Sequence, residues 1–318
     1  MRSDAAVADT PMPRAVPSWL AARFAPGQVR TATPLAWGFR NDTWRVDLAD
    51  GRPVVACRLA DPAAASRIVT LLARVADRFA AAGLPSPAIA QAGDPSDGVL
   101  VSEYVDGLPG AALLGEPGGA ELIGSLLGAT WLRLAAVEPD GLALDPSWTE
   151  PRGLAAGSLR RLARLGERAG DGQGDRPGDR LTHLDRTWMA AALDDLPGLL
   201  AERRPGFVHG DFVPVNVIIR ERAVVAVLDF ESARLADPLL DAAWFATIVA
   251  FHHPREARVA VAAFAKAAGL DLEDPPTRRL FAVLPVVRCL EILDDPRLSV
   301  TESERWLAIV RAHVARSR

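Results

Sequence analysis

The sequence predicts an α+β protein with a small, β-rich N-terminal part and a larger, mainly helical C-terminal part. Residues 44–59 and 99–105 contain short apolar runs rich in β-branched side chains, which strands prefer. After residue 120, apolar residues mostly recur at the period of amphipathic helices. Inside this helical part, two apolar runs at residues 217–219 and 224–228 flank a charged turn at residues 220–223, which predicts a single hairpin at residues 217–228.

Local signals divide the N-terminal part into elements. Residues 1–16 carry prolines and small residues and predict a mobile tail. Asp50-Gly51 predicts the turn of a hairpin, and Gly83 ends a long amphipathic helix. The predicted strands are residues 44–48, 54–59 and 99–105, and the predicted helices are residues 17–24 and 62–82.

The C-terminal part consists mainly of predicted helices. A stretch at residues 166–180 is rich in Gly, Asp and Arg and has no apolar anchor, which predicts a flexible loop. The expected helices are residues 120–137, 158–166, 188–200, 239–251, 255–268, 277–293 and 302–315.

Composition narrows the class of protein. The 318 residues are 49% hydrophobic and 24% charged, which is typical of soluble globular proteins. A formal net charge of −4 argues against nucleic-acid binding and is compatible with a cationic substrate. Cys57 and Cys289 form neither a disulfide framework nor a metal-site spacing. We see no signal peptide and no membrane-spanning run, and expect a cytoplasmic enzyme.

Three oxygen-bearing side chains surround the predicted hairpin. Asp211 follows His209-Gly210, Asn216 precedes the first strand, and Asp229 follows the second. In an antiparallel hairpin these strand ends are neighbours, so Asn216 and Asp229 should lie close together. Both side chains suit Mg²⁺, and Asp211 can face the same point. A base and two oxygen ligands for a hard cation are what phosphoryl transfer from a nucleotide requires, although each fragment alone could be a plain turn or strand end.

These motifs resemble the aminoglycoside phosphotransferase and choline kinase group of small-molecule kinases. That group carries H-G-D-x-x-x-x-N, a hairpin, D-[WF]-E and then D-P-x-x-D. The corresponding segments here are residues 209–216, 229–231 and 237–241. The resemblance implies a bilobal protein kinase-like fold, with a nucleotide-binding N-lobe at residues 17–105 and a catalytic, substrate-binding C-lobe at residues 106–318.

The resemblance also implies roles for single residues in the C-lobe. Asp211 would be the catalytic base, and Asn216 and Asp229 would be the magnesium ligands. Asp241 would brace the catalytic loop.

In the N-lobe, the resemblance implies a nucleotide-covering hairpin and a hinge that binds adenine through backbone groups. The chain's only lysine, Lys266, lies in its far half, so an arginine would bind phosphate. Relatives usually pair this cation with a Glu on the next helix, where Asp77 is the only acid after the opening turn, so the partner is left open. The implied nucleotide-binding residues are Gly38, Asn41, Arg58, Glu103 and Val105.

An acidic cluster at a helix end is the candidate acceptor site. Glu291, Asp294 and Asp295 have the spacing of one helix face. In aminoglycoside kinases, acids on the C-terminal helices bind the ammonium groups of the drug. The alternative is a solvated helix end. Tryptophans, Trp148 and Trp244 among them, would form aromatic walls or core.

The function expected from these features is ATP-dependent phosphoryl transfer, with Mg²⁺, to a hydroxyl of an antibiotic. That acceptor would be an aminoglycoside or another cationic compound, and the enzyme would confer resistance. One alternative is a metabolite kinase of the choline, homoserine or sugar type. Another is a nucleotide-binding protein with lost activity, given the missing Lys and helix Glu. The expected partners are a nucleotide and a small molecule, with no nucleic acid or membrane; the oligomeric state is open.

Overall fold

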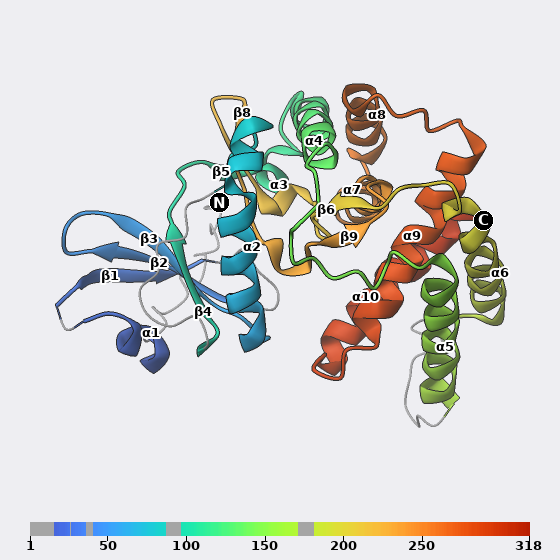
Figure 1. Ribbon diagram of the computed structural model, residues 1–318, viewed down its shortest axis with the longest axis horizontal. Coiled ribbons are helices and arrows are strands. Elements are labelled where there is room, and N and C mark those ends of the chain that lie inside the picture. The colour runs from blue at the N-terminus through green and yellow to red at the C-terminus, as the bar shows by residue number, and fades with distance from the viewer. Residues whose placement is uncertain (1–15, 26, 36–40, 87–96, 171–180) are drawn as a thin grey trace, which may run out of the picture. The chain divides into compact units, whose positions relative to one another are not determined.

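The computed structural model describes residues 16–25, 27–35, 41–86, 97–170 and 181–318 (Figure 1). Residues 1–15 of the predicted tail and Gly38 therefore lie outside the described residues, as do residues 171–180 of the predicted loop. The chain divides into two compact units, the first comprising residues 1–69 and 88–104 and the second residues 70–87 and 105–318. The predicted α+β class is confirmed, with a β-rich first unit and a helical second unit.

The first unit contains a four-stranded antiparallel sheet in the order β1-β2-β3-β4. Its strands are β1 (Val29–Pro34), β2 (Asp42–Leu48), β3 (Pro53–Arg58) and β4 (Val99–Glu103), and α1 (Ser18–Arg23) precedes them. Alternate residues of β2 are buried, because Trp44, Val46 and Leu48 point into the core. Leu20 and Phe24 from the α1 segment complete this core. Strand β1 was not predicted, because its residues are exposed or only half-buried.

The second unit is mainly helical and contains two small sheets, β5-β7-β8 and β6-β9. Its strands are β5 (Leu108–Pro109), β6 (Gly206–Val208), β7 (Val217–Arg220), β8 (Ala223–Val227) and β9 (Arg234–Ala236). Its helices are α3 (Gly110–Leu113), α4 (Gly119–Ala135), α5 (Pro151–Gly170), α6 (His183–Leu200), α7 (Leu239–His252), α8 (Ala257–Ala268), α9 (Pro275–Leu293) and α10 (Val300–Ser317). Helix α2 (Pro62–Ala81) contributes residues to both units.

Helices α5 and α6 begin seven and five residues earlier than predicted. Helix α5 starts at Pro151 and continues to Gly170, so residues 166–170 of the predicted loop are helical. Helix α6 starts at His183 with a capping box, in which Thr182 and Asp185 exchange side-chain and backbone hydrogen bonds. The expectation of an amphipathic α2 is confirmed. The apolar residues that recur along it at three- and four-residue steps are all buried, namely Ile68, Leu71, Leu72, Val75 and Phe79. Among the described residues, no helix is long and apolar enough to cross a membrane.

The predicted hairpin is formed by β7 and β8, which pair antiparallel. The turn is shorter than expected, since only Glu221 and Arg222 separate the strands. Both residues have positive φ, at 50° and 63°, as in the two-residue turns that match the twist of a hairpin. Asn216 and Asp229 therefore stand next to the open end of the hairpin, away from this turn.

Candidate active site

His209 joins the loop before the hairpin to the end of β8. Its buried ring donates a hydrogen bond from Nε2 to the Leu228 carbonyl at 2.7 Å, and Nδ1 accepts one from the Asp211 backbone N–H at 3.2 Å. This pattern requires the neutral ring. Burial lowers the pKa of His209, which also favours the neutral form. His209 thus holds Asp211 beside the residue that precedes Asp229.

Asp241 braces the same loop from α7. Its two carboxylate oxygens accept hydrogen bonds from the backbone N–H groups of His209 and Gly210, both at 2.8 Å. The side chain is 1% exposed, and burial raises its pKa to about 7 against the opposing effect of these two donors. The brace expected from the D-P-x-x-D segment is therefore visible as two backbone hydrogen bonds.

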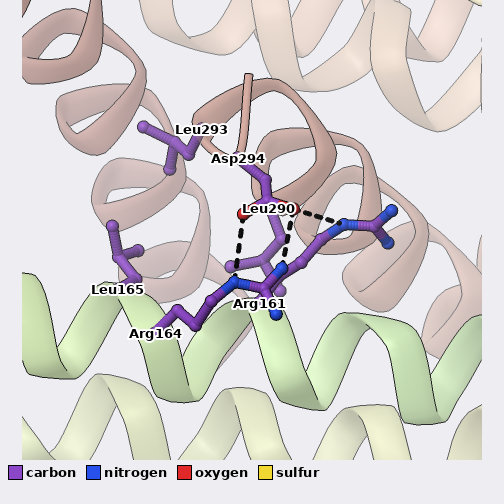
Figure 2. Close-up of a pocket in the computed structure, with 6 residues that line it drawn as sticks. All are labelled: Arg161, Arg164, Leu165, Leu290, Leu293 and Asp294. Atoms are coloured by element: carbon purple, nitrogen blue, oxygen red, sulfur yellow. Dashed lines mark hydrogen bonds and ion pairs between the residues drawn. The ribbon is translucent and has the colours of Figure 1, made fainter. Parts of the chain in front are cut away.

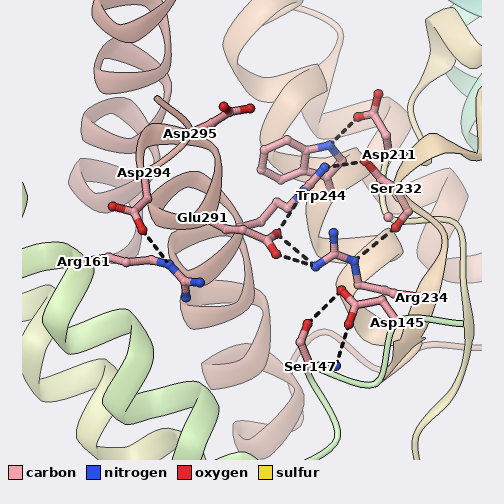
Figure 3. Close-up of polar contacts among 12 residues, drawn as sticks. Asp145, Ser147, Arg161, Asp211, Ser232, Arg234, Trp244, Glu291, Asp294 and Asp295 are labelled. Atoms are coloured by element: carbon pink, nitrogen blue, oxygen red, sulfur yellow. Dashed lines mark hydrogen bonds and ion pairs between the residues drawn. The ribbon is translucent and has the colours of Figure 1, made fainter. Parts of the chain in front are cut away.

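The carboxylate of Asp211 is held at both oxygens. Trp244 Nε1 donates to Oδ1 at 2.8 Å (Figure 3). Asn216 Nδ2 donates to Oδ2 at 2.9 Å. Asn216 Nδ2 also donates to the Asp211 backbone carbonyl at 2.9 Å. Asp211 is half-buried, so its carboxylate has a fixed orientation and still reaches solvent.

Asn216 and Asp229 are brought together by the hairpin, as predicted from the strand ends. The Leu228 N–H donates to the Asn216 carbonyl at 2.8 Å, which places Asp229 one residue from this contact. Asp229 has a left-handed backbone with φ 63° and ψ 65°, a conformation that Asp tolerates better than most residues. Its side chain keeps exposed surface, so the chain leaves it accessible to a ligand.

The surroundings of Asp229 disfavour its negative charge. Partial withdrawal from water raises its pKa to about 7, and the charges of Asp211 and Glu231 act in the same direction. Negative groups that repel one another in this way are well placed to receive a cation.

The side chains at this point suit Mg²⁺. Both hydrogens of the Asn216 amide face Asp211, so its Oδ1 is directed elsewhere, and no hydrogen bond occupies it within the described residues. Among those residues, no three His, Cys, Asp or Glu side chains converge as a metal site. An amide oxygen and one carboxylate match Mg²⁺ that takes its other ligands from phosphates and water.

Of the predicted nucleotide-binding residues, Asn41, Arg58, Glu103 and Val105 are described by the structure, whereas Gly38 is not. Asn41 Oδ1 accepts a hydrogen bond from the Ala60 N–H at 3.0 Å, just beyond β3. Arg58 is exposed, its guanidinium lies 5.5 Å from the Trp19 ring centre, and no described carboxylate of the first unit forms an ion pair with it. Glu103 ends β4, and Val105 follows at the start of the second unit.

The three predicted acceptor acids do not form one acidic surface. Helix α9 ends at Leu293, so Asp294 and Asp295 lie beyond its last residue. Their side chains point to different arginines. Glu291 pairs with Arg234 (Figure 3) and also with Arg288. Asp294 pairs with Arg161 and Arg164 (Figure 2), and Asp295 pairs with Arg297.

Comparison with known proteins shows the family of this chain. The sequence model of the phosphotransferase enzyme family (APH) matches residues 31–281. The chain belongs to this family. No curated protein matches it significantly.

Solved structures show the fold that this phosphotransferase shares. Macrolide 2′-phosphotransferase MphH from Brachybacterium faecium is 18% identical, over 88% of this chain and 92% of that chain, with a TM-score of 0.59. A thermostable mutant of aminoglycoside phosphotransferase APH(4)-Ia, bound to AMP-PNP and hygromycin B, is 18% identical. The match covers 91% of this chain and 94% of that chain, with a TM-score of 0.63. The GDP complex of aminoglycoside 2′-phosphotransferase-IIIa is 17% identical. The match covers 94% of this chain and 97% of that chain, with a TM-score of 0.66. The predicted kinase-like fold is thereby confirmed.

Sequence reasoning missed how buried side chains of this phosphotransferase support Asp211. Trp148 and Trp244 are 5% and 1% exposed, so both belong to the core and neither is an aromatic wall. His209 was noticed only as part of H-G-D, although its ring makes the link to Leu228. The one signal for Trp244 was its position three residues after Asp241, which puts both on the same side of α7.

Proposed function

We propose that this chain is a small-molecule kinase that transfers the γ-phosphoryl group of ATP to a hydroxyl of an antibiotic. The observation that carries the proposal is the grouping of Asp211, Asn216 and Asp229 at the open end of one hairpin. Family membership supports phosphotransfer, and two of the similar structures contain a nucleotide or its analogue.

In this mechanism, Asp211 accepts a hydrogen bond from the acceptor hydroxyl and aims its oxygen at the γ-phosphorus. The new O–P bond forms as the bond to the leaving nucleotide breaks, and the hydroxyl proton passes to the Asp211 carboxylate. Asn216 Oδ1 and the Asp229 carboxylate would hold Mg²⁺. When bound, Mg²⁺ neutralises charge on the phosphate oxygens.

The nucleotide would be held by the first unit and the segment after it. We assign phosphate contacts to Gly38, Asn41 and Arg58, and adenine contacts to the backbone of Glu103 and Val105. An arginine fork suits phosphate oxygens, which supports Arg58 in this role. Because ATP is abundant in the cytoplasm, we place the reaction there.

An antibiotic is the proposed acceptor because the similar structures are antibiotic phosphotransferases, one of them bound to hygromycin B. Resistance would follow from modification of such a drug. The acids Glu291, Asp294 and Asp295 would contact a cationic acceptor only at positions that their arginine partners leave open. The proposal therefore includes macrolides as well as aminoglycosides.

Mass spectrometry tests the proposal directly. The protein is incubated with Mg²⁺, ATP or GTP, and panels of aminoglycosides, macrolides and hydroxylated metabolites, and each compound is examined for a phosphate gain. We expect phosphorylation of at least one antibiotic. Phosphorylation of a choline, homoserine or sugar metabolite alone would replace the antibiotic assignment with metabolism. Tight ATP binding without any phosphorylated acceptor would contradict kinase activity.

A further inference from the structure

Trp244 makes a contact that its place in the core does not by itself require. It is 1% exposed on α7, and its ring stacks on Trp306 of α10, with ring centres 5.7 Å apart and an angle of 20° between them. A buried indole N–H needs an acceptor, and any backbone carbonyl would serve. Here the acceptor is Oδ1 of Asp211, at 2.8 Å (Figure 3).

The two hydrogen bonds to Asp211 divide its carboxylate between two partners. Asn216 binds Oδ2 from the hairpin side, and Trp244 binds Oδ1 from the helix side. Each carboxylate oxygen has two acceptor positions, so one position on each oxygen stays available for an acceptor hydroxyl. Rotation of the Asp211 side chain would break both bonds, which restricts it to one orientation.

Two residues within one turn of helix α7 form hydrogen bonds with the loop at residues 209–211. Asp241 accepts the backbone N–H groups of His209 and Gly210, and Trp244 donates to the side chain that follows them. Residues three apart lie on the same side of a helix, so both contacts arise from one rigid surface. The stacking on Trp306 fixes the indole ring and thereby the direction of its N–H.

We propose that Trp244 is a positioning residue for the phosphoryl-transfer reaction, acting by holding the Asp211 carboxylate through its indole N–H. This inference rests on the proposed function for its kinetic consequence, but the hydrogen bond itself does not. Small displacements of a catalytic group reduce rate strongly, whereas nucleotide binding depends on other residues. Loss of the indole donor should therefore lower kcat and leave the KM for Mg·ATP unchanged.

Trp131 offers a matched control within the same unit. It is also a buried tryptophan, 6% exposed, whose Nε1 donates one hydrogen bond at 3.0 Å, but its acceptor is the Pro238 carbonyl. Trp244→Phe and Trp131→Phe each remove one indole donor and a similar buried volume. If Trp244 had a purely structural role, the two variants should have similar kcat values.

The kinetic arm uses a compound that gains phosphate with the wild-type protein. We expect Trp244→Phe to lower kcat about tenfold or more, with the KM for Mg·ATP within about twofold of wild type. Trp131→Phe should keep the wild-type kcat, with a comparable loss in urea midpoint. Equal kcat values for Trp244→Phe, Trp131→Phe and the wild type would overturn the proposal.

The second arm needs no turnover, so it separates failure of this inference from failure of the proposed function. In protein labelled with ¹⁵N-tryptophan, the indole N–H signal lost in Trp244→Phe identifies Trp244. Asp211→Asn should move that signal upfield, because a charge-assisted hydrogen bond becomes a neutral one. The Trp131 signal should stay in place. An unmoved Trp244 signal would show that no such bond to Asp211 exists.

Discussion

Gly210 illustrates how a single residue constrains the loop that carries Asp211. Its φ of +80° favours glycine, and a Cβ atom built there would lie 2.2 Å from the Ser232 carbonyl oxygen. Its N–H is also bound by Asp241. The loop therefore passes too close to the chain after Asp229 to admit a side chain.

Gly210→Ala should lower the free energy of unfolding by about 2 kcal/mol or more, since it combines backbone strain with a steric clash. Urea denaturation measures the loss. Gly141→Ala is the control, because Gly141 has φ +74° but open space around its Cβ position, and it should cost only about 1 kcal/mol. Equal losses in the two variants would contradict the close approach to Ser232.

Asp211, Asn216 and Asp229 could be predicted from the sequence because they belong to one short, ordered pattern. The bond from Trp244 to Asp211 spans 33 positions, and the one from Asp241 to His209 spans 32. The first has only one local signal, the three-residue spacing between Asp241 and Trp244, because an indole on an apolar helix otherwise indicates core packing. The family resemblance implied that Asp241 braces the catalytic loop, but it did not identify the hydrogen bond from the His209 N–H.

At the level of elements, arginines from two separate segments keep the Glu291 carboxylate ionised. Arg234 of β9 and Arg288 of α9 both bind its carboxylate, at 2.9 and 2.7 Å. Burial opposes ionisation of Glu291, but the two guanidinium charges outweigh it and lower its pKa to about 2. Arg288 also donates to Ser232 Oγ at 2.7 Å, so the ion pairs extend to the chain after Asp229.

Glu291→Gln should lower the free energy of unfolding by about 3 kcal/mol, because it leaves two largely buried arginines without their counter-charge. Thermal and urea denaturation provide the measurement. The exposed Glu304, changed to Gln, is the control and should shift stability by less than about 0.5 kcal/mol. A stable Glu291→Gln protein with a raised acceptor KM alone would instead support the predicted acceptor role.

His313 links three helices and makes their packing sensitive to acid. From α10, its Nε2 donates to the Ala282 carbonyl of α9 at 2.8 Å, and Nδ1 lies 3.1 Å from Thr247 Oγ1 of α7. Burial, with a contribution from Arg316, lowers its pKa from 6.5 to about 4. Between these values the unfolded chain binds a proton that the folded protein does not, so stability falls as pH decreases.

The free energy of unfolding should therefore decrease between pH 6.5 and pH 4, with up to about 3 kcal/mol arising from His313. His313→Gln removes this titration, so its stability should vary less with pH in that range, although it is less stable than wild type at pH 7. Urea titrations at a series of pH values measure both curves. Parallel curves for the two proteins would show that His313 does not titrate as described.

Most elements could be predicted, whereas several boundaries could not. The period of α2 identified its buried positions, and the paired apolar runs identified β7 and β8. The turn at Glu221 and Arg222 was misjudged because neither residue is one that usually adopts positive φ. Strands β6 and β9 have three residues each, and pairing between distant segments, not local pattern, defines them.

For the whole molecule, we expect nucleotide binding to stabilise the fold through Asp229. A ligand that binds only the folded state adds about 2.7 kcal/mol at a hundredfold excess over its Kd. Mg·ATP should therefore raise the Tm of the wild-type protein, and EDTA should reduce that rise. In Asp229→Ala the response to ATP should be the same with and without Mg²⁺. A full Mg²⁺-dependent shift in that variant would remove Asp229 as a ligand.

In the proposed reaction Asp211 acts on the acceptor hydroxyl, and the turnover number of Asp211→Asn with Mg·ATP measures this role. The substitution keeps the shape of the side chain and removes its charge. Because general-base groups contribute about 10²–10⁴-fold, we expect kcat to fall by about that factor while the Kd for Mg·ATP stays near its wild-type value. A wild-type kcat in Asp211→Asn would show that Asp211 is not the catalytic base.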